Sequence, residues 1–316
     1  MDFGKPDDPG AVDWTLPPDG ALTAEYLPGT RADGARVYIG STAWGQREFV
    51  GEVYPAGTKP ADYLAAYGRQ FNCVELNATF YRVPDYAQVR RWYAAVPDDF
   101  RFCPKVAKGV SQSADLSTST ARALDFAKAV QHFGHKLGPC FVQLPRDFAT
   151  DRIDALRAFL ERWPPAVRLA VELRHPSWFG GGPRGLDLFA DLGARGIGSV
   201  ITDVGARRDA AHMQVTAGFA CVRWVGTDHP SDEGRLAAWA DRLAGWLGRG
   251  LREAYFFVHQ PAAVAGGRSA ERFARLLRAR LPPGIELRGP RLATGGAGAP
   301  PEGVDGPRDP APTLFP

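Results

Sequence analysis

Several absences limit what this chain of 316 residues can be. Its cysteines stand far apart inside apolar runs, so we expect reduced core residues rather than a disulfide framework or a zinc site, which need close pairs. The four are Cys73, Cys103, Cys140 and Cys221. The formal net charge of +3 leaves no basic footprint for direct nucleic-acid binding. No glycine-rich fingerprint follows a strand, which speaks against a bound dinucleotide.

Long apolar stretches are also missing. The first residues contain no apolar run behind a basic start, and no segment is long and apolar enough to span a bilayer. We therefore expect a cytoplasmic protein without membrane contact.

The composition that remains, 45% hydrophobic and 23% charged, is typical of a globular domain with a sizeable core. Residues 1–36 are rich in Pro, Gly, Asp and Ala and predict a mostly irregular extension. Residues 37–282 predict one domain. Residues 283–316 are again rich in Gly and Pro and predict a flexible tail.

Within the predicted domain, apolar runs of strand length alternate with helical patterns. Strands are expected at 37–42, 73–80, 100–105, 140–145, from Leu169 onward, and at 199–203, 219–224 and 254–259. Helices are expected near 59–70, 86–95, 121–137, 152–163, 185–195, 236–247 and 270–281. Eight strands that alternate with helices predict an α/β fold, a single (β/α)₈ TIM-like barrel. Spacing alone leaves an open doubly wound sheet as the alternative.

Polar residues recur near the ends of seven of these strands. If Val74 and Leu76 face the helices, Glu75 and Asn77 face the interior, and the same alternation applies along the other strands. The residues placed inward in this way are Glu75, Asn77, Lys105, Gln143, Glu172, Arg174, Asp203, Arg223 and His259. Because barrel enzymes bind ligands at the carboxyl ends of their strands, we expect a site there.

Six stretches carry a family resemblance. They are residues 38–44, 74–84 (Val-Glu-Leu-Asn-Ala-Thr-Phe-Tyr-Arg-Val-Pro), 102–105, 136–139, 142–145 and 171–178 (Val-Glu-Leu-Arg-His-Pro-Ser-Trp). From about residue 37 to 281 the chain resembles the domain-of-unknown-function 72 family, also called YecE-like. The resemblance implies a TIM-like barrel and no particular reaction.

The chain departs from the family pattern in four places. Ala43 replaces a Gly, an expected His after Lys105 is missing, Val225 replaces another His, and His259-Gln260 replaces an Asn pair. Chemistry that used those side chains is therefore not expected here.

Glu75 and Glu172 are the best pair for acid–base work, because one carboxyl of such a pair can be held protonated. Lys105 and Asp203 are further catalytic candidates. The alternative interpretation is a buried network in which each Glu pairs with Lys105, Arg174 or Arg223. The balance of acids and bases favours an anionic or sugar-like ligand. Expected substrate-binding residues are Trp44, Asn77, Tyr81, Gln143, Arg174, His175, Trp178, Arg223 and His259.

Metal binding and Schiff-base formation are two further candidate chemistries at this rim. Glu172 and His175 stand three apart and could, with Glu75, Asp203 and His259, bind a divalent metal. Strand alternation puts His175 out of phase, so we predict no cofactor and keep the metal as the alternative. A Schiff base on Lys105 needs a lowered pKa, and neighbouring carboxylates would raise it, which favours a role as an anion clamp.

The sequence thus predicts a hydrolase- or isomerase-type enzyme acting on a small anionic or sugar-like substrate. A second hypothesis is a metal-dependent phosphodiesterase linked to nucleic acids, docked on the sliding clamp through Thr313, Leu314 and Phe315, although the usual leading Gln of such peptides is absent. A third is a ligand-binding barrel without chemistry.

Overall fold

The computed structural model describes residues 4–27, 29–113, 115–285 and 287–290. Its strands are β1 (Arg36–Ser41), β2 (Cys73–Leu76), β3 (Arg101–Pro104), β4 (Cys140–Gln143), β5 (Leu169–Glu172), β6 (Gly198–Asp203), β7 (Phe219–Val225) and β8 (Glu253–His259). The helices are α1 (Thr23–Tyr26), α2 (Tyr63–Gln70), α3 (Ala78–Tyr81), α4 (Tyr86–Ala94), α5 (Lys108–Ser111), α6 (Thr120–Gln131), α7 (Ile153–Arg162), α8 (Pro183–Ala194), α9 (Ser231–Gly248) and α10 (Ala263–Arg278). Across these residues no helix is long and apolar enough to cross a membrane.

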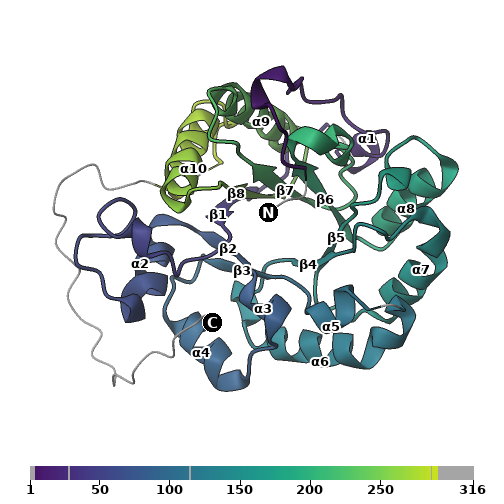
Figure 1. Cartoon of the computed structure of the whole chain (residues 1–316), viewed down its shortest axis with the longest axis horizontal. Helices are drawn as coiled ribbons and strands as arrows, with labels where there is room; N and C mark the ends of the chain where they lie inside the picture. The colour runs from purple at the N-terminus through teal and green to yellow at the C-terminus, as the bar shows by residue number, and fades with distance from the viewer. Residues whose placement is uncertain (1–3, 28, 114, 286, 291–316) are drawn as a thin grey trace.

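The strands lie in the middle of the molecule and the longer helices surround them (Figure 1). Six strands form one parallel sheet in the order β1-β8-β7-β6-β5-β4, and β2 pairs with β3 in a second parallel sheet. The predicted α/β fold with parallel strands is therefore confirmed. The predicted closed barrel is not, because the two sheets do not form one continuous ladder within the described residues.

A side chain joins β1 to β2 where a backbone ladder would be expected. Asn72 donates from Nδ2 to the Val37 carbonyl at 2.8 Å and accepts at Oδ1 from the Ile39 amide at 2.8 Å. Its amide group thus takes the place of a peptide unit. The two strands also approach closely at Gly40, where a Cβ atom would lie 2.3 Å from the Cys73 carbonyl oxygen, so only glycine fits. This contact could not be foreseen from strand patterns.

Backbone bonds do cross the other gap, between β3 and β4. The Gly138 amide donates to the Phe102 carbonyl at 2.7 Å, and the Val106 amide donates to the Phe141 carbonyl at 2.9 Å. The eight strands therefore stand in a ring, although their hydrogen bonding is interrupted at β1/β2 and reduced to single bridges at β3/β4.

Apolar side chains fill both faces of this ring. Outside it, α7 buries Ile153, Leu156, Phe159 and Leu160, the spacing of an amphipathic helix. Inside it lies a second cluster, formed by Tyr38, Cys73, Cys103, Phe141, Ala170, Val200, Ala217, Phe219, Cys221, Tyr255 and Phe257. All four cysteines are free and buried, as expected for core residues.

Two boundaries differ from the sequence-based prediction in ways that matter below. The strand expected over 73–80 stops at Leu76, and Ala78–Tyr81 forms the short helix α3. In addition, α10 begins seven residues earlier than expected. The sequence pattern did not predict these first turns because Gly266 and Gly267 have low helix propensity. Gly267 is required by packing, since a Cβ there would lie 2.6 Å from Val53.

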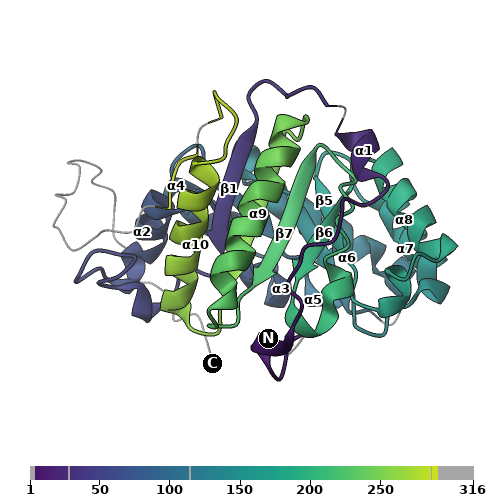
Figure 2. The same cartoon turned by 90° about the horizontal axis from the view of Figure 1, so that it is seen from above.

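The N-terminal extension lies against the domain instead of standing free. Figure 2 shows it crossing the molecule past β7, β6 and α9. Asp19 binds Arg242 at 2.9 Å and accepts from the Trp246 indole at 3.0 Å, while Thr23 donates to the Met213 carbonyl at 2.6 Å. These contacts hold residues 4–27 as a strap over the domain.

Candidate functional site

Six strands deliver a polar side chain to one connected network at the carboxyl end of the ring. Its members are Glu75, Lys105, Gln143, Glu172, Arg223 and His259, all of which the alternation of residues predicted to face inward. Sheet register explains why they meet, since paired residues of parallel strands point to the same side. Gln143 pairs with Glu172, and Glu75 pairs with the interior residue Cys103.

Arg223 is the centre of the network. Its guanidinium donates to both oxygens of Glu75, at 2.9 and 3.0 Å, and to Oε2 of Glu172 at 2.8 Å. All three residues are buried. Burial raises the pKa of Glu75, but Arg223 and His259 outweigh it and hold the pKa well below the usual range. Burial also raises the pKa of Glu172, but the charges of Arg223 and Arg174 outweigh this effect, so the pKa lies below its usual value.

Both carboxyl groups are therefore anionic at neutral pH, and all four of their oxygens accept hydrogen bonds. Neither carboxyl of the pair is held protonated, because Arg223 bonds to both and the Arg174 and Lys105 charges also favour the anionic form of Glu172. The alternative interpretation, a buried ion-pair network, describes them correctly.

Gln143 connects Glu172 to Lys105. Its Nε2 donates to both oxygens of Glu172 at 2.9 Å, and its Oε1 accepts from Lys105 Nζ at 2.9 Å. The Lys105 ammonium also lies 4.3 Å from the centre of the Phe80 ring. Burial, followed by the charge of Arg223, lowers the pKa of Lys105 despite the neighbouring carboxylates. The expected upward shift of this pKa is thus wrong in sign.

His259 lies on the other side of Glu75. Its Nε2 is 2.9 Å from Glu75 Oε2, and its Nδ1 has no hydrogen-bond partner among the residues that the structure describes. Burial lowers the pKa of this ring although Glu75 raises it, so the imidazole is neutral at pH 7. A neutral ring that donates from Nε2 to the carboxylate keeps Nδ1 as a proton acceptor.

Two further predicted residues reach the network from its edge. Arg174 donates from Nε to Glu172 Oε1 at 3.3 Å, and Asn77 donates from Nδ2 to Glu75 Oε1 at 3.0 Å. With Arg174 the cluster holds three cationic side chains against two carboxylates. The excess positive charge suits an anionic ligand.

Asp203 does not belong to this network, so its predicted inward position is wrong. In the register of β6 with β7, Thr202 pairs with Arg223 and Asp203 pairs with Trp224, so Thr202 faces the interior and Asp203 faces the helices. The Asp203 carboxylate accepts from the Trp239 indole at 2.8 Å and pairs with Arg235 at 3.1 Å and with Arg208. Strand β6 therefore ends on a polar residue, Asp203, whose side chain lies on the helix-facing side of the sheet.

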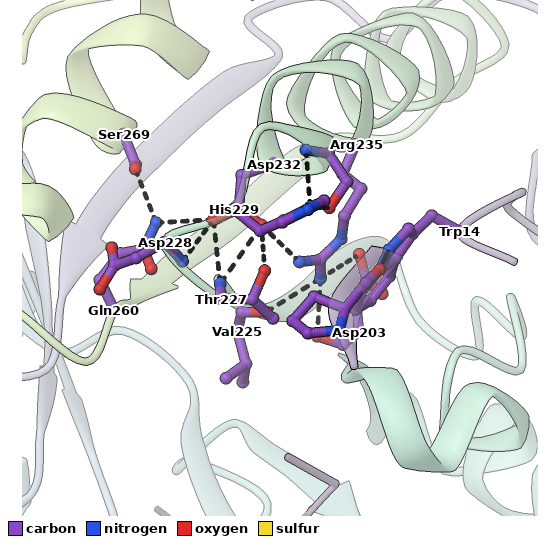
Figure 3. Close-up of polar contacts among 12 residues, drawn as sticks. Trp14, Asp203, Val225, Thr227, Asp228, His229, Asp232, Arg235, Gln260 and Ser269 are labelled. Atoms are coloured by element: carbon purple, nitrogen blue, oxygen red, sulfur yellow. Dashed lines mark hydrogen bonds and ion pairs between the residues drawn. The ribbon is translucent and has the colours of Figure 1, made fainter. Parts of the chain in front are cut away.

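Figure 3 shows the cluster around Asp203. Arg235 lies between Asp203 and Asp232, and its guanidinium stacks 3.8 Å from the ring centre of Trp14 in the strap. Asp232 in turn accepts from the Thr227 amide at 2.9 Å and from Gln260 at 3.1 Å. The carboxylates of Asp203 and Asp232 both pair with arginines, and the cluster ties β6, α9 and the strap together.

The remaining predicted binding residues lie apart from the network or at its border. Trp178 is a buried core residue whose indole donates to the Phe148 carbonyl at 2.7 Å, and it lines a separate cavity of about 280 Å³ that no network residue lines. His175 caps the turn Pro176–Trp178 by accepting from the Ser177 amide at 3.2 Å. Trp44 packs edge to face on Trp92, with 5.7 Å between ring centres. Tyr81, in contrast, is 79% exposed.

The two alternative partners are a divalent metal and the sliding clamp. In the described ranges, no group of three or more His, Cys, Asp or Glu residues is arranged to hold a metal ion, and Glu75 and Glu172 are occupied by Arg223. The sliding-clamp segment Thr313, Leu314 and Phe315 lies outside the described residues.

Sequence reasoning missed Phe80 and Thr202. The Phe80 ring faces the Lys105 ammonium, and its place in the Glu-Leu-Asn-Ala-Thr-Phe-Tyr stretch was a usable signal. The Thr202 hydroxyl is buried without a hydrogen-bond partner in the part of the chain that is described, and no sequence signal marks it.

A cavity of about 420 Å³ opens at the carboxyl ends of β1 and β8, lined by residues that include Ser41, Thr42, Val258 and Gln260. Its volume is in the range of small-molecule sites. None of the six network residues lines this cavity, although the neighbours of His259 in the chain, Val258 and Gln260, do. The cavity is therefore separate from the network.

Comparison with known proteins gives a consistent result. The family model described as "Protein of unknown function DUF72" matches residues 38–290. The UPF0759 protein YecE of Escherichia coli K12 is 30% identical over 244 residues, which cover 71% of this chain and 86% of YecE. A DUF72 family protein of Thermotoga maritima superimposes with a TM-score of 0.60 at 23% identity, covering 77% of this chain and 99% of that one. One from Enterococcus faecalis gives a TM-score of 0.59 at 17% identity, covering 77% and 98%.

Proposed function

The chain belongs to the DUF72 family, and from its rim network we propose that it is an acid–base enzyme for a small anionic or sugar-like substrate. The observation that carries this proposal is the excess of cationic side chains. Arg223 satisfies Glu75 and Glu172, while Lys105 has hydrogen-bonding capacity left, since in the described part of the chain its ammonium donates only to Gln143. A phosphate or carboxylate group bound there would complete the charge balance.

The roles follow from the hydrogen bonds. Lys105 holds the anionic group and stabilises negative charge that develops on it. Gln143 and Glu172 position the Lys105 ammonium. His259, held by Glu75 through Nε2, accepts a proton at Nδ1. Because both Glu carboxyl groups are anionic and fully hydrogen-bonded, we assign them positioning roles and no proton transfer.

A ligand-binding barrel without chemistry is the second candidate. It is favoured by the engagement of all four oxygens of Glu75 and Glu172, which leaves His259 as the base. His259→Asn separates the two functions in a screen of phosphorylated and glycosidic compounds. An enzyme loses turnover in this variant while ligand affinity persists, whereas a binding module shows no turnover in either protein.

The anion site is tested by calorimetric titration of methyl phosphate and acetate into wild type and Lys105→Met. We expect the substitution to weaken binding roughly tenfold or more, and added salt to weaken binding to the wild type. Lys128→Met is the matched control, because it removes the same charge from the exposed face of α6. Equal affinity in wild type and Lys105→Met would overturn the proposal.

A further inference from the structure

Tyr81 is the most exposed of the large hydrophobic residues that the structure describes as exposed, with 79% of its surface accessible. It ends the short helix α3, directly after the strand that carries Glu75. Figure 2 shows α3 and α5 next to each other on one side of the molecule. An exposed aromatic face at the rim of a candidate site is available for a ligand ring to stack on.

The helix that carries Tyr81 is fixed to the site. Thr79 donates its hydroxyl to the Leu76 and Lys105 carbonyls, at 2.8 Å in each case, and Asn77 binds Glu75 Oε1 and the Thr42 carbonyl. The backbone that presents the Tyr81 ring is therefore held by the same residues that hold the network. Such a ring loses little conformational freedom when a ligand packs on it.

Phe80 connects the ring of Tyr81 to the ammonium of Lys105. The Tyr81 and Phe80 rings meet edge to face with 5.2 Å between centres, and Lys105 Nζ lies 4.3 Å from the Phe80 centre. These distances keep the Tyr81 ring within about 10 Å of the ammonium, which suits a ligand ring stacked on Tyr81 with a phosphate or carboxylate beside it.

We propose that Tyr81 is a stacking platform of the rim site, and that the ligand carries its anionic group on a ring whose face packs on the phenol. The proposal rests on the anion site proposed above and narrows its ligand class. Lys105 binds the charge and Tyr81 binds the ring. An aromatic ring and a pyranose ring share this chemistry, and the test below distinguishes them.

The test compares ligands of equal charge. Calorimetric titration of phenyl phosphate, methyl phosphate and glucose 6-phosphate gives the affinity that a ring adds to the same anionic group. In the wild type we expect phenyl phosphate or glucose 6-phosphate to bind roughly three- to tenfold more tightly than methyl phosphate. The tighter of the two identifies an aromatic or a sugar ring.

Variants assign that preference to a residue. Tyr81→Ala should abolish the preference and leave the affinity for methyl phosphate unchanged, while Tyr81→Phe should retain it. Tyr86→Ala is the matched control, because Tyr86 is also exposed, at 59%, but packs edge to face on His132 of the neighbouring helix end. It should behave as the wild type.

The outcomes separate the two proposals. If methyl phosphate binds through Lys105 and neither ring adds affinity, or if Tyr81→Ala keeps the preference, the platform is wrong and the anion site stands. If neither these phosphates nor benzoate and acetate bind the wild type, both proposals fall.

Discussion

Arg223 on β7 donates two hydrogen bonds, at 2.9 and 3.0 Å, across the interior to the carboxylate of Glu75 on β2. The two strands belong to different sheets, so this ion pair is one of the bonds that hold the ring together. Neither side chain can be removed singly without leaving a buried charge uncompensated.

Arg223→Met is therefore expected to lower the free energy of unfolding by about 3–5 kcal/mol, measured by urea denaturation at pH 7. The loss arises because Glu75 no longer faces a guanidinium and Glu172 keeps only the longer guanidinium contact, with Arg174. Adding Glu75→Gln to Arg223→Met should recover part of it, because one of those charges is then gone. If Arg223→Met alone were as stable as the wild type, the central role of Arg223 in the network would be contradicted.

Stability should also fall in acid because of Glu75 and Glu172. Their pKa values are lower in the folded chain than the ordinary value of 4.5, so the unfolded chain binds their protons first. Their contribution is complete above pH 4.5 and is lost as pH falls through the folded-state pKa values. Urea titrations between pH 6 and pH 3 measure this slope, which Glu172→Gln should make shallower.

His212 adds a second acid-sensitive step at higher pH. Burial lowers its pKa from 6.5 to about 4, and the neutral ring lies against the Val200 carbonyl at 3.2 Å while accepting from the Gln214 amide. The unfolded chain takes up this proton first, so about 3 kcal/mol of stability should disappear between pH 6.5 and pH 4. His212→Gln should flatten that part of the profile. An unchanged slope would show that His212 titrates normally.

Asp203→Asn separates structure from function at the rim. Its carboxylate is buried against Arg208, Arg235 and Trp239, so the amide should cost about 2–3 kcal/mol of stability. The affinity for methyl phosphate should not change, because Asp203 faces away from the ring interior. If the variant is fully folded under the assay conditions and still binds methyl phosphate more weakly, Asp203 belongs to the binding site after all.

Trp14 should fix the strap on the domain. Its ring lies 3.8 Å from the Arg235 guanidinium and 5.2 Å from that of Arg208. Trp14→Ala is expected to cost about 1–2 kcal/mol and to accelerate hydrogen exchange at the Gly20 and Ala206 amides, which bond across the strap contact. Trp14→Phe keeps a ring and should give an intermediate effect. Unchanged exchange in the alanine variant would mean that other contacts hold the strap.

Residue alternation predicted most of the rim because strand geometry leaves few choices. A period of two places Glu75, Lys105, Gln143, Glu172, Arg223 and His259 on one face once the apolar face of each strand is known. It failed for β6, where apolar Val200 and Ile201 lie on opposite faces and give no direction. The register with β7, which the sequence does not contain, selects Thr202 over Asp203.

Other features depended on long-range packing. The run after Glu75 reads as a continuing strand, yet it turns helical at Ala78 because Thr79 bonds back to Leu76 and across to Lys105. The charge states of Glu75 and Glu172 also needed coordinates. The sequence alone is compatible with one of the two carboxyl groups being protonated, and only the position of Arg223, bonded to both, excludes this.

The amide of Asn72 has a consequence for which mutations this fold can accept. Strands joined by main-chain bonds place few demands on side-chain identity, but β1 and β2 are joined through side chains, chiefly one donor and one acceptor of Asn72 and the Tyr67 hydroxyl, which accepts from the Ser41 amide and donates to the Cys73 carbonyl. Aspartate lacks the donor, leucine lacks both groups, and glutamine would displace them by a methylene. In a library of all twenty amino acids at this position, selected for folded chains, asparagine should be the most enriched residue, while the Tyr67 bridge still joins the two strands in the other variants.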